Sequence, residues 1–424
     1  MNLAKKAIFI SLSPNVEEDD IRLVLELIRK PGIWKKGEGI EKLEEEFKKF
    51  LGIKYAFSFN SGRSALLAIL TALDIGEGDE VLLQAFTCNA AVNPILSRKA
   101  LPVFVDIDDK LNLSVEDLKR KITPRARAII VQHTFGYPAQ LGPILKIAKE
   151  NNLYLIEDCA HSLGARYKEG LCGTFGDASF FSLGRDKVIS SVFGGMALTN
   201  NDKIGKEIKR FWEGIGFPSD LWTFQQLLHP LLTNYLVFPA YGANRRLGRI
   251  VLGIFHKLFI LSKAVSWKEK KGQMPGWFIQ RMANALAILA ENQLRKLERF
   301  NQHRKKIAEF YRQKLKDRFE MPFLEEEEDV FPIFMRFPIL ANKNTDQILK
   351  KAAERKIYLN DGWRKSPIVP EDTDLERMRY KLGSCPRAEE LAKRIVNLPT
   401  HINISFEKAE RIVNFLKMEL SGSR

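Results

Sequence analysis

The chain has 424 residues, of which 67 are Lys or Arg and 52 are Asp or Glu, so its formal net charge is +15. We expect more than one lobe, because single hydrophobic cores stop growing near about 250–300 residues. The basic excess indicates an anionic partner, such as a nucleotide diphosphate, a nucleic acid or an anionic membrane surface, although solvated helix faces explain most of it. The sequence does not favour nucleic acid as the partner, since it has no zinc-finger spacing, aromatic RNA-binding motif or basic heptad region.

The cysteines favour a reducing compartment. No CxxC pair and no secretory leader occur, and the sequence shows no zinc-site spacing. The chain contains four cysteines, which are Cys88, Cys159, Cys172 and Cys385. We therefore expect a cytoplasmic protein with free thiols.

The first half of the chain alternates strands and helices. An N-terminal helical arm covers Val16 to Arg29 and Glu41 to Leu51. Apolar runs with helical segments between them then follow, and these runs predict about seven strands between Tyr55 and Thr199. Such β-α repeats indicate an α/β fold with a mostly parallel sheet.

Charged residues follow two of the predicted strands. The strand from Leu153 to Ile156 ends in Glu157 and Asp158, and the strand from Ala178 to Leu183 is soon followed by Lys187. Ligands of open α/β sheets bind at the carboxyl ends of the strands. A carboxylate and a lysine there suit pyridoxal 5'-phosphate (PLP), whose ring nitrogen needs an acid and whose aldehyde needs an amine. Taken singly, the two residues can equally be a helix cap and a solvated lysine.

A phosphate site is predicted where a helix starts directly after the strand from Tyr55 to Asn60. The helix opens with Ser61-Gly62-Arg63-Ser64, and a helix N-terminus offers unpaired N–H groups and partial positive charge. An ordinary N-cap is the alternative. His133, after the strand from Ala126 to Gln132, either faces the site or is a structural histidine.

The central motifs carry a family resemblance. They occur in the order Asp158, His161-Ser162, a Gly-rich turn, Phe181-Ser182, Lys187 and Gly194-Gly195. This order resembles the signature of the DegT/DnrJ/StrS family of PLP-dependent (nucleotide-)sugar aminotransferases. The resemblance implies the PLP-dependent transferase fold type I, with a large seven-stranded domain, a smaller α+β C-terminal domain, and a homodimeric assembly.

The resemblance gives the central residues their expected roles. Lys187 is expected to bond the cofactor covalently and then to move a proton, because transamination needs an amine that does both. Asp158 is expected to pair with the protonated ring nitrogen, His161 to lie near the ring oxygen, and Ser182 to donate to the phosphate. The family's dehydratases carry histidine in place of this lysine, so Lys187 favours an aminotransferase.

Several positions depart from the family pattern. Gly62, Arg63 and Ser64 fall in the phosphate-binding turn, where Arg63 replaces a threonine and either contacts phosphate or faces solvent. Cys88 stands where an aromatic side chain usually stacks on the ring. Ile279 stands where an asparagine of the neighbouring subunit usually reaches the phosphate, and Arg63 or Arg281 can compensate.

A further departure is Phe193, in the loop that precedes Gly194-Gly195. The departures at Cys88, Phe193 and Ile279, together with an apolar segment in the middle of the chain, favour a rival interpretation. In that interpretation the chain is a catalytically weak, membrane-associated sugar-binding or regulatory protein of the same fold.

The apolar segment is an insert at residues 211–276. It contains the runs LLHPLLTNYLVFPAY and IVLGIFHKLFIL with basic residues around them, and neither run reaches the roughly 20 residues that span a bilayer. One interpretation buries the insert as helices in a subunit interface or against the core. The other places residues 227–261 on the inner face of the membrane as a peripheral contact.

We therefore predict three parts. These are residues 1–210 as the PLP-binding domain with its helical arm, 211–276 as the insert, and 277–424 as a connecting helix, from Trp277 to Leu294, and a small C-terminal domain. The resemblance implies transfer of an amino group from glutamate or glutamine to a keto-sugar linked to a nucleotide or lipid diphosphate.

Overall fold

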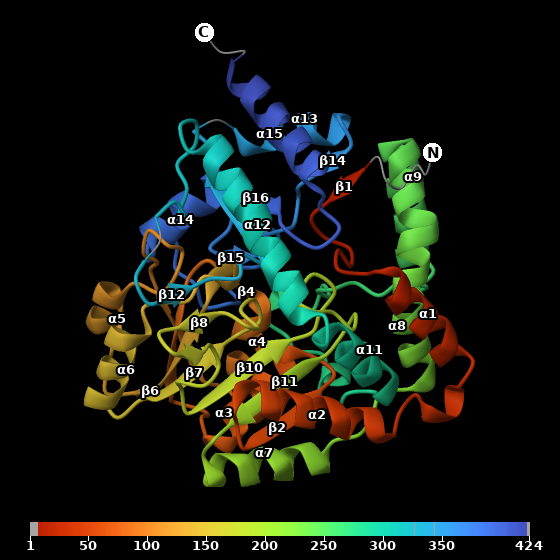
Figure 1. The fold of residues 1–424 in the computed structure, drawn as a ribbon. Coiled ribbons are helices and arrows are strands. Elements are labelled where there is room, and N and C mark those ends of the chain that lie inside the picture. Colours follow the sequence, from red (N-terminus) through yellow and green to blue (C-terminus); the bar gives the residue numbers. More distant parts are fainter. Residues whose placement is uncertain (1–6, 326, 343, 422–424) are drawn as a thin grey trace.

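The computed structural model describes residues 7–325, 327–342 and 344–421. Its centre is a seven-stranded sheet in the order β2-β11-β10-β7-β6-β3-β5, in which only β11 runs antiparallel to its neighbours (Figure 1). The strands are β2 (Tyr55–Phe59), β3 (Glu80–Gln84), β5 (Leu101–Val105), β6 (Ala126–Gln132), β7 (Tyr154–Asp158), β10 (Ala178–Ser182) and β11 (Gly195–Thr199). The predicted α/β fold with a mostly parallel sheet is confirmed.

The inner strands are apolar along their whole length because both of their faces are buried. Leu82, Ile129 and Leu155 point to one face, where they pack against the helices α5 (Val115–Lys121) and α6 (Leu141–Glu150). Their sequence neighbours, such as Leu83 and Ile130, belong to the larger core cluster. The helices α4 (Asn89–Ser97) and α7 (Asp202–Gly214) both pack on α3 (Gly62–Ala72), and α2 (Glu38–Leu51) packs against β2.

The C-terminal part forms a smaller α+β layer above the sheet (Figure 1). An antiparallel pair, β13 (Arg336–Leu340) and β16 (Ile395–Pro399), lies among the helices. These helices are α12 (Leu297–Leu315), α13 (Thr345–Glu354), α14 (Pro386–Arg394) and α15 (Phe406–Ser421), whereas α11 (Asn284–Leu294) packs against α2.

Short strands tie distant segments together. β1 (Ile8–Phe9) pairs with β14 (Ile357–Tyr358), so the start of the described chain lies on the C-terminal layer. β4 (Thr87–Cys88) pairs with β15 (Ile368–Val369), which brings the C-terminal layer to the edge of the large sheet. A third group joins β8 (Arg166–Tyr167), β9 (Gly170–Leu171) and β12 (Val330–Phe331). The remaining elements before the insert are α1 (Glu18–Ile28), η2 (Pro31–Ile33) and η3 (Thr134–Gly136).

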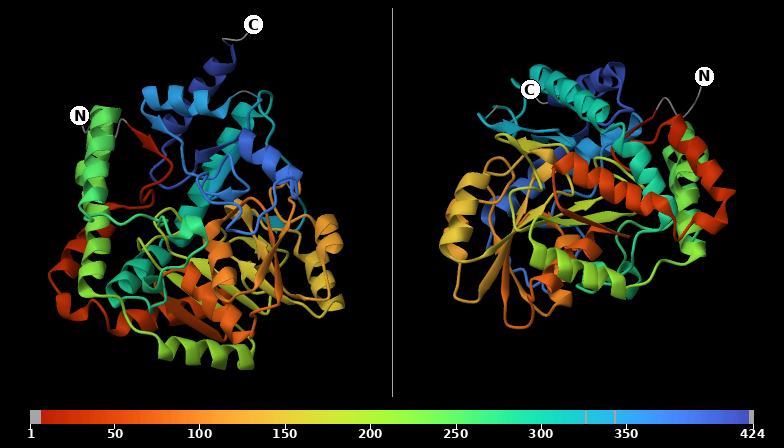
Figure 2. Two further views of the ribbon diagram at one scale, coloured as in Figure 1. Left: turned by 180° about the vertical axis from the view of Figure 1, so that it is seen from behind. Right: turned by 60° about the horizontal axis from the view of Figure 1, so that its bottom comes forward.

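The insert is helical and stands as a column on one flank of the molecule (Figure 2). Its elements are α8 (Asp220–Leu232), the π-helical η4 (Thr233–Val237), α9 (Phe238–Ala243), α10 (Arg245–Lys257), η5 (Glu269–Lys271) and η6 (Gly276–Phe278). α8 packs against α1, and α10 packs against α9. Within the described ranges, every helix is too short or too polar to cross a bilayer.

The predicted helix from Trp277 to Leu294 is wrong in its first half. The α-helix begins only at Asn284, because the preceding residues extend along the end of β2. The Asn60 N–H donates to the carbonyl oxygen of Gln280 at 3.0 Å, and Arg281 forms a bridge with Phe59. The domain limits at residues 210 and 276 stay a prediction.

Candidate active site

A cavity of about 190 Å³ lies at the carboxyl edge of the sheet, where the predicted residues meet. Seven of the eight predicted residues line it, and these are Gly62, Arg63, Cys88, Asp158, His161, Ser182 and Lys187. Ser64 is the exception. The insert contributes Ala264 and Val265 to the wall, and the C-terminal layer contributes Asp361 and Trp363.

Lys187 and His161 are in direct contact. The Lys187 Nζ lies 2.9 Å from the His161 Nε2. The Nδ1 of His161 accepts the backbone N–H of Phe135 at 3.4 Å, which leaves the Nε2 to face the lysine. Burial, with the positive charges of Lys187 and Arg336, holds the pKa of His161 well below its ordinary value. The lysine therefore has an uncharged imidazole as its neighbour.

The His161 ring is held between two aromatic side chains. Phe135 stacks on it with 5.7 Å between ring centroids, and Trp363 approaches edge-on at 4.8 Å. Both rings are buried. His161 therefore has little room to turn away from Lys187.

Asp158 ends β7 beneath the same cavity. One of its carboxylate oxygens accepts the backbone N–H of Ala160 at 3.0 Å, and the side chain is buried. Burial raises its pKa from 3.8 to about 6, although the Ala160 hydrogen bond and Lys187 act in the opposite direction. A buried carboxylate with so few partners suits a protonated ring nitrogen. Gln132, at the end of β6, is its neighbour across the sheet.

The predicted phosphate turn is a capped helix N-terminus. The Ser61 hydroxyl oxygen caps α3 by accepting the Ser64 N–H at 3.2 Å. A Cβ on Gly62 would lie 3.2 Å from the Cβ of Ser182, so glycine lets the helix start close to the end of β10. This junction offers N–H groups and a serine hydroxyl to an anion.

Ser64 lies away from the cavity. Its hydroxyl lies 2.9 Å from the Oδ1 of Asn60, and it also contacts the carbonyl oxygen of Phe278. The side chain is buried, and its N–H is used by the Ser61 cap. Its hydroxyl is therefore committed to the packing of this junction.

Arg63 does not face solvent. Its Nη1 lies 2.9 Å from the Glu269 carboxylate, its Nη2 donates to the carbonyl oxygen of Ala264 at 2.7 Å, and its guanidinium covers the Phe278 ring. All three partners belong to residues 264–278. The insert and the residues after it thus hold this arginine at the cavity wall.

Of the other residues that depart from the family pattern, some line the cavity and some lie outside it. Cys88 caps α4 with its sulfur, lines the cavity, and has a thiol pKa raised by burial. Phe193 also lines the cavity and lies under the guanidinium of Arg185, which donates to the carbonyl oxygen of Ser262 at 2.5 Å. Ile279 does not line the cavity, and Arg281 donates to the backbone carbonyls of Trp212 and Glu213 instead.

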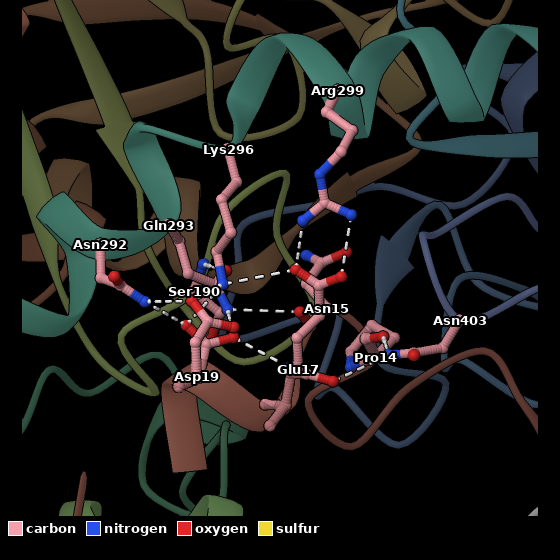
Figure 3. Close-up of polar contacts among 12 residues, drawn as sticks. Pro14, Asn15, Glu17, Asp19, Ser190, Asn292, Gln293, Lys296, Arg299 and Asn403 are labelled. Atoms are coloured by element: carbon pink, nitrogen blue, oxygen red, sulfur yellow. Dashed lines mark hydrogen bonds and ion pairs between the residues drawn. The ribbon is translucent and has the colours of Figure 1, made fainter. Parts of the chain in front are cut away.

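The N-terminal arm reaches the segment that follows Lys187. The Asn15 side-chain amide donates to the carbonyl oxygens of Lys187 at 2.7 Å and Val188 at 3.1 Å. The Oδ1 of Asn15 accepts from Arg304 at 3.0 Å, and Gln293 accepts the N–H of Ser190 at 2.9 Å. Figure 3 shows Asn15 and Ser190 beside the helices that carry Gln293, Lys296 and Arg299.

Ion pairs fix this arm in place. Arg299 contacts Glu17 with one nitrogen to oxygen distance of 2.9 Å, and Lys296 contacts Asp19 at 2.7 Å and Asp20 at 3.0 Å (Figure 3). The start of α1 is therefore docked on α11 and α12.

Arg336 is a cavity-side residue that sequence reasoning missed. It is 2% exposed and pairs with Asp186 at 2.6 Å and Asp361 at 2.9 Å, so it connects the Lys187 segment to the C-terminal layer. Arg336, Asp361 and Trp363 come from sequence positions far from the central motifs. For Arg336, the sequence signal is an arginine within an otherwise apolar strand pattern, where a charged residue is uncommon.

His133 is the structural histidine of the two alternatives. It is fully buried, its Nε2 lies 3.2 Å from the Glu157 carboxylate, and its Nδ1 accepts the N–H of Ala139 at 3.1 Å. Glu157 in turn accepts backbone N–H groups, including that of Gly173 at 2.7 Å. Neither residue lines the cavity.

A lysine and a buried carboxylate at the carboxyl edge of this sheet, beside a helix N-terminus, define a PLP-dependent enzyme of fold type I. The donor set fits the cofactor, since amine, acid and anion-binding N–H groups share one cavity. The model of the DegT/DnrJ/EryC1/StrS aminotransferase family matches residues 14–248 and 256–417. The chain belongs to this family, whose members depend on PLP.

Individual relatives agree with the family. GDP-perosamine synthase of Escherichia coli O157:H7 is 28% identical over 93% of this chain and 94% of its own. The dTDP-3-amino-3,6-dideoxy-alpha-D-galactopyranose transaminase of Aneurinibacillus thermoaerophilus is 26% identical over 93% and 94%. Among solved structures, E. coli GDP-4-keto-6-deoxy-D-mannose-3-dehydratase with hydrated PLP has a TM-score of 0.73 at 21% identity, and covers 97% of this chain and 100% of its own. The two relatives support the aminotransferase interpretation and not the rival of a weak sugar-binding protein, and the solved structure supports the fold.

Proposed function

We propose that this chain transfers an amino group to a keto-sugar carried on a nucleotide diphosphate. The observation that carries the proposal is that Lys187 and Asp158 line one cavity at the carboxyl edge of the sheet. The relatives named above act on GDP- and dTDP-linked sugars, as their names state. A lipid diphosphate in place of the nucleotide would present the same anionic group.

The residues divide the work of holding PLP. Lys187 is the covalent anchor, and Asp158 keeps the ring nitrogen protonated, while PLP supplies the electron sink when it is bound. Ser182 and the N–H groups at Gly62 would bind the phosphate at the start of α3. His161 would contact the ring oxygen, and Cys88 would contact one ring face. Arg63 gives the phosphate a positive neighbour, whereas Ser64 contributes only through the packing of this turn.

Proton movement is assigned to Lys187. The Nζ of Lys187 would hold the proton that transamination moves from one carbon to another. The neutral His161 ring, 2.9 Å away, orients that amine without competing with it as a cation. The aromatic side chains around His161 keep water away from this pair.

Glutamate or glutamine is the proposed amino donor, and a homodimer is the proposed assembly. We place the enzyme in the cytoplasm, with residues 227–261 in peripheral contact with the inner face of the membrane. The donor and the assembly rest on the family resemblance. The membrane contact rests on the surface of the insert described below.

The proposal is tested with the purified chain and PLP. We would record the absorption spectrum, reduce with borohydride, map the labelled peptide, and then add excess glutamate to unreduced protein. Label on Lys187 and glutamate-driven conversion of the cofactor to its amine form are expected. Label on another lysine, or no covalent cofactor, would contradict the proposal.

A further inference from the structure

The outer side of α10 carries a row of apolar side chains that the described residues leave about half exposed. Leu247, Ile250, Ile254 and Leu258 are spaced by three, four and four residues, which places them on one side of the helix. They are 46–62% exposed, and Gly248 is the one buried residue of α10. We call these four residues and Phe259 the insert face.

Phe259, which follows α10, is both exposed and held in an unfavourable backbone conformation. Its φ is 55°, a left-handed conformation that is unfavourable for a bulky residue. The side chain is nevertheless 81% exposed. A strained backbone that presents an aromatic ring to water points to a binding role.

The charge around the insert face has one sign. No Asp or Glu occurs between Asp220 and Glu269, whereas six basic residues do, namely Arg245, Arg246, Arg249, Lys257, Lys263 and Lys268. Within the described part of the chain, none of the six forms an ion pair with a carboxylate. The surface therefore complements an anionic partner.

Three of these cations form a hollow at the start of α10. Arg245, Arg246 and Arg249 line it together with Asn244 and Ile250. Helix N-termini favour negative charge, so three arginines in the first turns are unfavourable unless an anion joins them. The hollow borders the apolar row directly, because Ile250 belongs to both.

We propose that the insert face docks on an anionic phospholipid membrane, with its apolar side chains at the acyl boundary and its arginines on the phosphate groups. A second copy of the chain is a poorer occupant, since a two-fold interface would bring the same basic patch against itself. The docking does not depend on the proposed reaction. It concerns the active site because the chain runs from α10 directly to Ala264 and Val265 in the cavity wall.

The test is flotation of the full-length protein with phosphatidylcholine vesicles that contain or lack phosphatidylglycerol. One variant combines Arg245→Gln, Arg246→Gln and Arg249→Gln, and another combines Leu247→Ser, Ile254→Ser and Phe259→Ser. The control combines Leu382→Ser and Phe406→Ser, two residues of the C-terminal part that are 68% and 52% exposed. Circular dichroism and gel filtration check each fold and assembly.

We expect binding only to the vesicles with phosphatidylglycerol, weakening with salt. The arginine variant should bind roughly a hundredfold more weakly, the apolar variant at least about tenfold more weakly, and the control unchanged. Wild-type binding by both insert variants, or equal loss in the control, would overturn the proposal. So would an apolar variant that splits a dimer but still binds vesicles.

A separate observation concerns Asn15, which is 1% exposed. It has no role in the family resemblance, yet its amide donates to the carbonyls of both Lys187 and Val188, and its oxygen is held by the buried Arg304. The segment from Leu183 to Gly194 has no helix or strand of its own. We infer that Asn15 is a positioning residue, which fixes the backbone beneath Lys187 so that the Nζ points at His161.

Asn403 provides a matched control. Its side-chain amide donates to the carbonyls of Pro14 at 2.8 Å and Val16 at 2.9 Å, so it holds the same arm without touching Lys187 (Figure 3). Asn15→Ala and Asn403→Ala should therefore loosen the arm alike. Only Asn15→Ala frees the carbonyl of Lys187.

The test compares kcat, KM and the pH titration of the lysine-bound cofactor spectrum, and it rests on PLP attachment at Lys187. Asn15→Ala should lower kcat about tenfold, leave KM within about twofold, and shift the midpoint of the titration. Asn403→Ala should change the melting temperature alone. Equal effects of both variants on the spectrum, or an unchanged midpoint in Asn15→Ala, would overturn the inference, whereas label off Lys187 would contradict the proposed function itself.

Discussion

The carboxyl edge of the sheet and the insert use apolar residues in opposite ways. In β7 and β10 the apolar run is buried, and it holds Asp158 and Ser182 at the cavity. In α10 a comparable run leaves Leu247, Ile250 and Ile254 about half exposed. The first arrangement fixes chemical groups in space, whereas the second keeps a surface available for a partner.

The difference teaches what an apolar run can reveal. An apolar run that lies between helical segments and ends in an acid or a lysine is best explained as a buried strand of an α/β sheet. The end of that strand then marks the site. An apolar run flanked by cations has several possible locations, because a core, a subunit interface and a membrane can each bury apolar surface. Contacts in space are needed to separate them.

The sharpest test of the sheet edge is Lys187→Ala. Turnover should fall by about 10³-fold or more, because both the covalent anchor and the proton carrier are lost. Kinetics with glutamate and the spectrum with PLP measure the effect, while circular dichroism should show an unchanged fold. Lys209→Ala, an exposed lysine of α7 paired with Glu213, is the control and should behave as wild type. Normal turnover in Lys187→Ala would refute the site.

The link between the sheet edge and the C-terminal layer is tested by Arg336→Leu. The change leaves Asp186 and Asp361 without their shared cation, and Asp361 is 3% exposed at its side chain. Breaking a buried pair from one side costs about 3–5 kcal/mol. Urea unfolding measures this loss of free energy of unfolding. Arg387→Leu breaks the exposed pair with Asp109 and should cost at most about 1 kcal/mol.

Local sequence predicted the sheet edge well and the rest of the cavity poorly. The strand ends, Gly62, Asp158 and Lys187 follow from short-range periodicity and from the rule that parallel strands end together. Arg336 and Trp363 were not predicted, because their positions depend on how the C-terminal layer packs on the sheet. Ser64 was placed in the site by its motif, but its hydroxyl turns to Asn60 and Phe278.

The buried acid of the sheet edge should make stability depend on pH. Because burial raises the pKa of Asp158 from 3.8 to about 6, the folded chain without PLP holds this proton more tightly than the unfolded chain. Its contribution to the free energy of unfolding therefore falls as pH rises from about 4 to about 6, by about 3 kcal/mol.

Asp158→Asn removes that loss. Without PLP the variant should match wild type near pH 4 and be more stable by up to about 3 kcal/mol at pH 7 to 8, as measured by urea unfolding. Its affinity for PLP should drop about 10- to 100-fold, because the ring nitrogen loses a charged partner. A variant that is less stable than wild type at pH 8 would show that the carboxylate is stabilising in the empty cavity.

The smallest expected effect is that of a substitution at Phe259, and it compares the insert face directly with the buried sheet edge. Phe259→Ser should change the free energy of unfolding by no more than about 0.5 kcal/mol, because the ring is 81% exposed and covers little of the core. Phe181→Ala, at a ring 1% exposed beside Ser182, should cost about 3–5 kcal/mol. Thermal and urea unfolding of both variants, in the absence of vesicles, measure the contrast. A large cost at Phe259 would mean that a second copy covers the insert face in solution, and the two regions would then use their apolar residues for the same purpose.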